Sequence, residues 1–192
     1  LNAAQKVDAS FSLLSTDFVF DGEKGNYIES DIPNPLSVYA QSKVDAESIL
    51  INSANKNWSI VRTIIVFGEG NNLSRSNIVL WAKEALSSGE ELNIIDDQFR
   101  APTWADDLAW GCIKIAELHK NGIYHISGPE TFSIYDLVLR VAKFCGLDTA
   151  SLNKTTSESL NQAARRPPKT GFDLSKARSD IDYRPMSFED SL

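Results

Sequence analysis

The 192-residue chain has no block of basic residues and no long apolar run. Its 19 lysines and arginines are outnumbered by 26 aspartates and glutamates, which gives a net charge of −7 and argues against nucleic acid as a partner. No stretch has the length of a membrane span and no signal-peptide pattern is present, so no membrane association is predicted. The two cysteines, Cys112 and Cys145, lack metal-ligand spacing. They are interpreted as reduced core residues of a cytoplasmic protein, and no metal site is predicted.

A glycine-rich turn of the form G-x-x-G-x-x-G or G-x-G-x-x-G is also missing from the chain. Such a turn cradles a dinucleotide pyrophosphate after the first strand of many nucleotide-binding folds. The sequence begins without methionine, and residues 1–7 have the pattern of a helix tail. We therefore expect a fragment that lacks about 100 residues of a two-half sheet on its N-terminal side.

Strand-like and helix-like segments alternate along the chain, which predicts an α/β fold. Residues 11–14 and 18–20 are predicted to form a buried strand with a polar break at Ser15-Thr16-Asp17. A helix follows, from the stretch 36–43 to about residue 52, and residues 58–67 form a second strand rich in β-branched side chains. Together these three elements predict a parallel βαβ unit.

The remaining elements are predicted from turn residues and caps. Ser133 should cap a helix that Gly146 ends, and Thr103 to Asp106 resembles a capping box. The expected helices are 77–87, 107–119, 133–145 and 175–178, and the expected strands are 92–95 and 122–126.

Tyr39 and Lys43 lie four residues apart on the first long helix, so their side chains should share one face. A cation beside a phenol favours the phenolate, and a tyrosine tuned in this way exchanges a proton with an alcohol or a developing alkoxide. Such pairs also occur by chance, so the surrounding residues decide whether this pair is interpreted as catalytic. Thr16 should emerge at the carboxyl edge of the sheet near this helix, where its hydroxyl could bind a substrate carbonyl. The three groups suit carbonyl reduction, which needs a nicotinamide cofactor because no side chain supplies hydride.

Several short motifs occur in the order seen in one known family. They are STDFVFDG at 15–22, the Tyr39 and Lys43 pair, RT at 62–63, FGEGNN at 67–72, APT at 101–103 and DLA at 107–109. As a set they resemble the extended short-chain dehydrogenase/reductases, in particular the dTDP-4-dehydrorhamnose reductase branch. The resemblance covers about residues 1–146 and continues loosely to Phe188.

This resemblance implies a Rossmann-like doubly wound parallel sheet, incomplete at the N-terminus, with a small C-terminal substrate-binding subdomain. Residues 1–70 would be the C-terminal part of the NAD(P)-binding domain. Residues 71–192 would mainly form the sugar-nucleotide-binding subdomain, with about 92–120 returning to the Rossmann sheet.

The resemblance also implies a reaction, the reduction by NADPH or NADH of the 4-keto group of a dTDP-linked 6-deoxy sugar. Thr16 would be the catalytic hydroxyl, Tyr39 the general acid and Lys43 the group that tunes it and binds the nicotinamide ribose. The implied cofactor contacts are Tyr39, Lys43, Ile64 and Ile65, and the implied substrate contacts are Thr16, Asp17, Phe18, Asn71, Asn72 and Arg100. A homodimer is compatible with the resemblance.

Two departures from the branch keep the substrate and other functions open. Phe18 stands where the branch usually has tyrosine, and Ile65 where it commonly has tryptophan. An epimerase or dehydratase of the same fold is one alternative. Dehydratases usually need an acidic pair beside the hydroxyl, and Asp17 with Phe18 provides one carboxylate, which favours a reductase. The other alternative is a non-catalytic regulatory subunit, similar to the β-subunit of methionine adenosyltransferase, or a fragment with only a structural role.

Other polar residues have simpler interpretations. Arg62 is predicted to be a structural charge at a strand end, and His125 a packed core residue between apolar neighbours. Arg165 and Arg166 fit either a phosphate-binding site or a solvated loop.

Overall fold

A three-stranded parallel sheet in the order β1-β2-β7 lies at the centre of the computed structural model, which describes residues 1–70, 76–160 and 164–192. The strands are β1 (Phe11–Thr16), β2 (Trp58–Thr63) and β7 (Gly122–His125). All but the last residue of β2 are buried, as expected for a parallel strand covered on both faces. The predicted α/β fold with parallel strands is confirmed.

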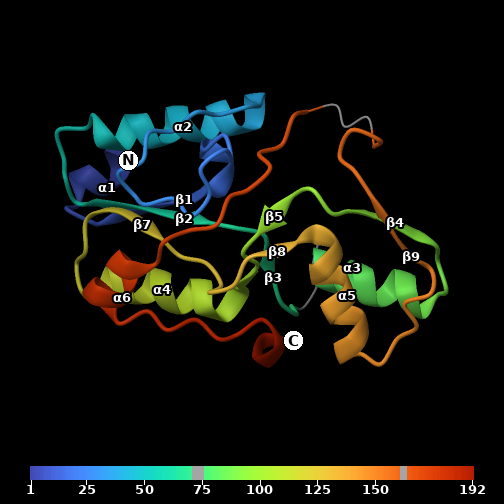
Figure 1. The fold of residues 1–192 in the computed structure, drawn as a ribbon. Helices are drawn as coiled ribbons and strands as arrows, with labels where there is room; N and C mark the ends of the chain where they lie inside the picture. The colour runs from blue at the N-terminus through green and yellow to red at the C-terminus, as the bar shows by residue number, and fades with distance from the viewer. Residues whose placement is uncertain (71–75, 161–163) are drawn as a thin grey trace.

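Helices cover both faces of this sheet (Figure 1). α2 (Val38–Ile51) connects β1 to β2 and lies on one face, whereas α4 (Ala105–Glu117) and α6 (Ser175–Ile181) lie on the other. Buried side chains from β2, α4 and α6, such as Val61, Ile115 and Ile181, belong to one apolar cluster. Each fully buried aliphatic side chain of this kind contributes about 1.5–3 kcal/mol to folding.

A second group of elements packs beside the sheet around its own apolar cluster (Figure 1). In it α3 packs against α5, β4 pairs in parallel with β9, and β5 pairs antiparallel with β8. The bounds are β3 (Val66–Phe67), α3 (Ile78–Ser87), β4 (Leu92–Ile95), β5 (Phe99–Arg100), β6 (Thr103–Trp104), β8 (Phe132–Ser133), α5 (Ile134–Phe144) and β9 (Leu152–Thr155). The short elements α1 (Asn2–Lys6), η1 (Asp17–Val19) and η2 (Glu189–Ser191) complete the described chain.

The strand that returns to the central sheet is β7, just after the predicted range 92–120, while β4 pairs with β9. β3 and β6 form a separate parallel pair. The division into two domains at residue 70 stays a prediction.

Three local details differ from the predictions. Thr16 continues strand β1 in extended conformation and pairs with Thr63, so the polar break begins at Asp17, where η1 starts. The second strand ends at Thr63 and resumes as β3, because Ile65 takes a φ of 28° that a strand cannot accommodate. The third difference is that the predicted capping box at Thr103 to Asp106 does not form.

Thr103 is part of strand β6 and does not cap a helix. Its hydroxyl donates to the carbonyl of Ile64 at 2.6 Å, and α4 begins at Ala105 without a side-chain cap. The predicted cap of α5 is confirmed, since the Ser133 hydroxyl accepts from the amide of Asp136 at 3.0 Å. Gly146, at a φ of 64°, ends that helix as expected.

His125 is fully buried on β7, which confirms the prediction of a packed core residue. Its ring stacks on Phe172 with 3.9 Å between centroids, and Nδ1 lies 3.1 Å from the carbonyl of Tyr27. Burial, followed by the nearby charge of Arg62, lowers the pKa of His125 from 6.5 to about 3. The folded protein therefore holds this imidazole neutral.

A His125→Gln variant is expected to make the free energy of unfolding less dependent on pH. Below the ordinary histidine pKa the unfolded chain binds a proton at this residue that the folded state refuses until about pH 3. The free energy of unfolding of the wild type should therefore fall as pH falls through this window, by up to about 1.4 kcal/mol per pH unit, and the variant should lack this contribution. Urea denaturation at pH 7, 6, 5 and 4 measures the slope, with the exposed His119→Gln as control. Equal slopes in both variants would show that His125 is protonated in the folded state.

Candidate active site

The first turns of α2 present Tyr39 and Lys43 on one face. Ser37 starts the helix, because its hydroxyl accepts from the amide of Ala40 at 3.2 Å. The Lys43 ammonium lies 6.0 Å from the centroid of the Tyr39 ring and donates to the carbonyl of Leu14 at 3.3 Å. The Tyr39 side chain is 53% exposed. Within residues 1–70, 76–160 and 164–192 its phenol makes no hydrogen bond, so it is available to a ligand.

Thr16 lies at the carboxyl end of β1, next to this helix. Its hydroxyl accepts from the amide of Phe18 at 3.3 Å and donates to Asp17 Oδ1 at 3.1 Å. This local cap turns the chain into η1, so that the Phe18 ring meets the Tyr39 ring edge-on with 6.3 Å between centroids. The strand end and the helix start are therefore in contact, and Phe18 is the residue that joins them.

The Asp17 carboxylate is buried behind Thr16 and is held by two other segments. Its Oδ2 accepts a hydrogen bond from the Thr170 hydroxyl and lies 3.7 Å from Arg100 Nε. Burial raises the pKa of Asp17, and the opposing effects of Arg100, Thr170 and Thr16 are smaller. Asp17 is thus a group whose ionised form depends on these three neighbours.

Arg100, an implied substrate contact, lies in β5 with its side chain 2% exposed. Its guanidinium donates to the carbonyls of Phe99 at 2.7 Å, Pro167 at 2.6 Å and Pro168 at 3.3 Å. It also stacks over the Phe18 ring, 5.4 Å from the centroid. Arg100 therefore fixes the segment around residues 167–168 against the end of β1.

An open groove of about 590 Å³, here called the Tyr39 groove, runs beside the phenol. It is lined by Pro35, Leu36, Ser37, Val38, Tyr39, Gln41, Ala164 and Arg165. A second groove of about 500 Å³ shares Ala164 and Arg165 with it and adds Arg166 to its lining. Arg165 therefore lines the groove of the phenol, and Arg166 lines the adjoining groove together with the acidic Glu158. The sequence left Arg165 and Arg166 open between a phosphate-binding site and a solvated loop, and both now line a groove.

The predicted cofactor contacts lie where β2 ends. Ile64 is fully buried, and its carbonyl is occupied by the Thr103 hydroxyl at 2.6 Å. Ile65 accepts from the Thr103 amide at 3.0 Å and holds a φ of 28°, a costly value for a β-branched residue. The role of Ile64 and Ile65 as cofactor contacts stays a prediction, and the sequence contains no G-x-G-x-x-G run.

Two predicted substrate contacts, Asn71 and Asn72, lie outside the described residues. No helix in the described part of the chain is long and apolar enough to cross a membrane.

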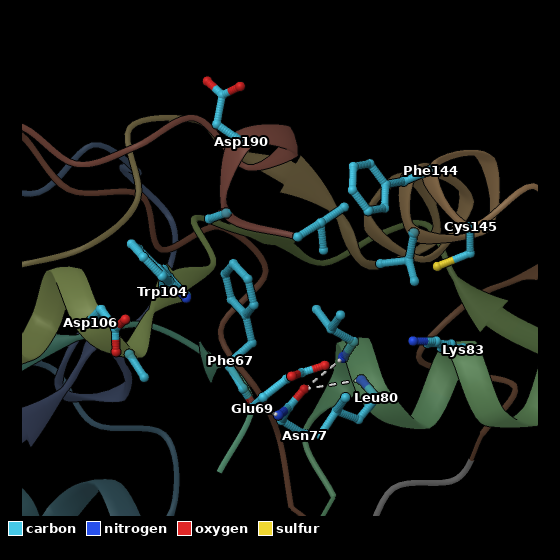
Figure 2. Close-up of a pocket in the computed structure, with 16 residues that line it drawn as sticks. Phe67, Glu69, Asn77, Leu80, Lys83, Trp104, Asp106, Phe144, Cys145 and Asp190 are labelled. Carbon is cyan, nitrogen blue, oxygen red and sulfur yellow. Dashed lines mark hydrogen bonds between the residues drawn. The ribbon is translucent and has the colours of Figure 1, made fainter.

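Figure 2 shows another cavity, of about 400 Å³, between α3, α5, the start of α4 and residues 190–192. Asn77 borders it and caps α3, since its Oδ1 accepts from the amides of Val79 and Leu80 at 3.1 Å each. None of the predicted site residues that the structure describes is among the residues that line this cavity. The Tyr39 groove, together with Lys43 of the same helix and the end of β1 that this helix contacts, is therefore the candidate active site.

Comparison with known proteins identifies the family of this chain. A family model described as RmlD substrate binding domain matches residues 1–192. The chain belongs to the RmlD substrate binding domain family. The extended short-chain dehydrogenase/reductase resemblance inferred from the motifs, in the dTDP-4-dehydrorhamnose reductase branch, is thereby confirmed.

Three relatives show the range of this RmlD domain. dTDP-4-dehydrorhamnose reductase of Aggregatibacter actinomycetemcomitans is 32% identical over 203 residues, which cover 99% of this chain and 67% of the relative. Methionine adenosyltransferase 2 subunit beta of Xenopus tropicalis is 30% identical over 178 residues, 90% of this chain and 53% of the relative. The solved dTDP-4-dehydrorhamnose reductase of Bacillus anthracis str. Ames, in complex with NADP, is 26% identical with a TM-score of 0.90, covering 98% of this chain and 66% of that one.

The RmlD domain therefore spans between about half and about two thirds of the length of these relatives. The structural match confirms the Rossmann-type α/β fold. One of these proteins is a reductase that was solved with NADP, and another is a subunit of a different enzyme.

Proposed function

We propose that the protein is an NAD(P)H-dependent reductase of a nucleotide-linked 4-keto-6-deoxy sugar, with Tyr39 of the Tyr39 groove as proton donor and Lys43 and Thr16 beside it. The observation that carries this proposal is the contact between the end of β1, which bears Thr16, and the face of α2, which bears Tyr39 and Lys43. The reductases among its relatives support it. The nicotinamide would supply the hydride when bound.

The chain's own residues would handle the proton and the carbonyl oxygen. The Thr16 hydroxyl would turn from Asp17 to donate to the keto oxygen, which polarises the carbonyl. Tyr39 would pass its phenolic proton to the developing alkoxide, and the Lys43 ammonium would stabilise the phenolate that remains. The phenol is exposed, whereas Thr16 is buried at the strand end with its hydroxyl bonded to Asp17 and to the amide of Phe18, so that the Thr16 hydroxyl would have to exchange a partner.

The substrate would lie along the two joined grooves. Arg165 and Arg166 would bind the diphosphate, since guanidinium groups form charge-assisted pairs with phosphate oxygens. Phe18 offers an apolar ring beside Tyr39, which suits the methyl group of a 6-deoxy sugar. Arg100 and Asp17 would act from behind this surface, because both are buried against protein groups. Asn71 and Asn72 would extend the site beyond the described residues.

The direct test is turnover of protein expressed from the complete reading frame. Oxidation of NADPH or NADH at 340 nm is followed with a dTDP-linked 4-keto-6-deoxy sugar, and with the corresponding 4-hydroxy sugar as control. Cofactor oxidation is expected with the keto sugar and not with the 4-hydroxy sugar. Absence of cofactor oxidation with every nucleotide-linked keto sugar, in protein shown to be folded, would exclude the reductase.

A Thr16→Val variant is expected to lower kcat by about 10²-fold, because one hydrogen-bond donor to the keto oxygen is lost. It should also lose about 1 kcal/mol of stability with the cap that Thr16 provides to Phe18. Thr16→Ser keeps the hydroxyl and serves as the matched control. Steady-state kinetics per folded protein separates the two effects, and equal kcat values for the valine and serine variants would remove Thr16 from the mechanism.

A second function is favoured by one observation, the 30% identity to methionine adenosyltransferase 2 subunit beta over 90% of this chain. As a regulatory subunit the protein would change the activity of a partner enzyme without turning over a sugar nucleotide itself. Addition of the folded protein to a methionine adenosyltransferase, with and without NADPH, tests this alternative. A changed KM for methionine, together with no reductase turnover, would favour the regulator.

A further inference from the structure

The Glu47 carboxylate is buried beneath α2 and bonded to both neighbouring strands. Its side chain is 2% exposed, and it forms a bidentate pair with Arg62 of β2, at 2.9 Å to Nε and 2.6 Å to Nη2. It also accepts from the hydroxyl of Ser15 on β1 at 2.6 Å. Ser15 immediately precedes Thr16 and lies opposite Arg62 in the strand register. One carboxylate therefore connects α2 to β1 and β2 at the level of the proposed catalytic hydroxyl.

Arg62 is in turn held on its remaining sides. Its Nη1 lies 3.4 Å from His125 Nε2, and its guanidinium lies over the Phe20 ring, 5.0 Å from the centroid. A neutral His125 that donates from Nδ1 to the carbonyl of Tyr27 leaves Nε2 as an acceptor for Arg62. The arginine thus has a fixed position in the core, and the carboxylate of Glu47 can occupy only one place against it.

Apolar packing alone gives α2 little directional restraint. Ala40, Glu47 and Leu50 are its buried residues, so a methyl group and one leucine are all the fully buried apolar surface that the helix provides. Apolar contact is non-directional, whereas a bidentate, hydrogen-bonded pair in a low-dielectric core has a defined geometry. The position of α2 along its axis therefore depends on Glu47.

Glu47 lies one turn beyond Lys43 and two turns beyond Tyr39, on the same face of α2. We propose that the buried Glu47–Arg62 pair is a positioning device that sets the height of Tyr39 and Lys43 relative to Thr16. The proposal rests on the proposed reductase function of this groove. It deepens that function by adding two positioning residues that touch neither substrate nor cofactor.

A contribution to the stability of the fold explains the Glu47–Arg62 pair less well than a positioning role. Replacing a buried ion pair by apolar residues of similar volume is often neutral or stabilising, whereas removing one partner leaves an uncompensated charge. The informative variant is therefore the double substitution Glu47→Met with Arg62→Met, which removes both charges and keeps the volume. A variant with one substitution alone would mix misplacement with unfolding.

The double variant is expected to fold, with cooperative unfolding near the wild-type midpoint. Its kcat should fall by about 100-fold, the loss that a shift of about 1 Å in a catalytic group produces. KM for cofactor and sugar nucleotide should change by less than about threefold, since the groups that bind them are retained. Asp45→Asn, which removes an exposed carboxylate from the same helix, is the matched control and should leave kcat unchanged.

Crystal structures of the wild type and the double variant provide a readout that needs no activity. We expect the Cα atom of Tyr39 to move by about 1 Å relative to Thr16 in the variant. If the wild type turns over but the double variant keeps its kcat, the positioning role is overturned while the reductase stands. If the wild type shows no turnover, the reductase function is excluded. The two structures then test the positioning role by themselves, and a Tyr39 that has not moved in the double variant overturns that role.

Discussion

A Tyr39→Phe variant is expected to lose about 10²–10⁴ in kcat while keeping its fold and its affinity for cofactor. The substitution removes only the phenolic oxygen, which is the proposed proton donor. The ring stays, so its edge contact with Phe18 and its proximity to the Lys43 ammonium are preserved. Because the side chain is 53% exposed, the free energy of unfolding should change by no more than about 0.5 kcal/mol.

Steady-state kinetics with a keto sugar nucleotide gives kcat, and fluorescence titration with NADPH gives the cofactor affinity. Tyr135→Phe is the matched control, since this tyrosine belongs to α5 and its ring lies under Lys154, away from the Tyr39 groove. A Tyr39→Phe variant with wild-type kcat would refute the proton-transfer mechanism. Loss of cofactor binding together with kcat would instead show that the phenol acts by binding the cofactor.

An Arg100→Met variant is expected to lose about 3–5 kcal/mol of stability, which is the penalty for breaking a buried ion pair by removing one partner. Asp17 would keep its buried carboxylate without the cation that lies 3.7 Å away. The carbonyls of Pro167 and Pro168 would also lose their donors. For a chain of this length the unfolding midpoint should fall by roughly 6–20 °C.

The pH dependence of this loss identifies its cause. Burial already raises the pKa of Asp17, and removal of Arg100 raises it further because the opposing cation is gone. Protonation relieves the orphaned charge, so the stability difference between variant and wild type should shrink as pH is lowered from 8 to 5. The double variant Arg100→Met with Asp17→Asn should recover part of the loss at pH 8.

Arg140→Met is the matched control for Arg100. Arg140 pairs with Glu189 on the surface, where the side chains are 41% and 42% exposed, so its removal should cost less than about 1 kcal/mol. Thermal unfolding at pH 8 and pH 5 measures all four proteins. Equal losses from Arg100→Met and Arg140→Met would show that the Asp17 pair contributes no more than a surface contact.

The contact between the end of β1 and the face of α2 that bears Tyr39 and Lys43 could be predicted, because each step depends on local periodicity. The helical repeat places Tyr39 and Lys43 on one face, and a βαβ unit brings the end of β1 to the start of the next helix. These rules need no knowledge of distant residues. The motif order then added the family, which the comparisons confirmed.

The burial of Glu47 and Arg100, and the partners that they bind, could not be predicted from local periodicity. Each is a charged residue, and charged residues are exposed unless a partner is buried with them. The partners come from far along the chain: Arg62 lies 15 residues from Glu47, and Pro168 lies 68 residues from Arg100. The interpretation of Arg62 as a structural charge is confirmed, but nothing in its local sequence identifies Glu47 as the partner.

The hydrogen bond between Thr170 and Asp17 has a consequence for biosynthesis. It joins residues 153 positions apart, and it can form only after residue 170 has left the ribosome. Contacts of such long range are slow to form, because a large loop must be closed before they contribute any stability. The strands and α2 can assemble earlier, since their pairings span much shorter distances. The end of β1, where Thr16 lies, therefore acquires its native surroundings later than the strand itself, and a nascent chain stalled before residue 170 lacks the bond to Asp17.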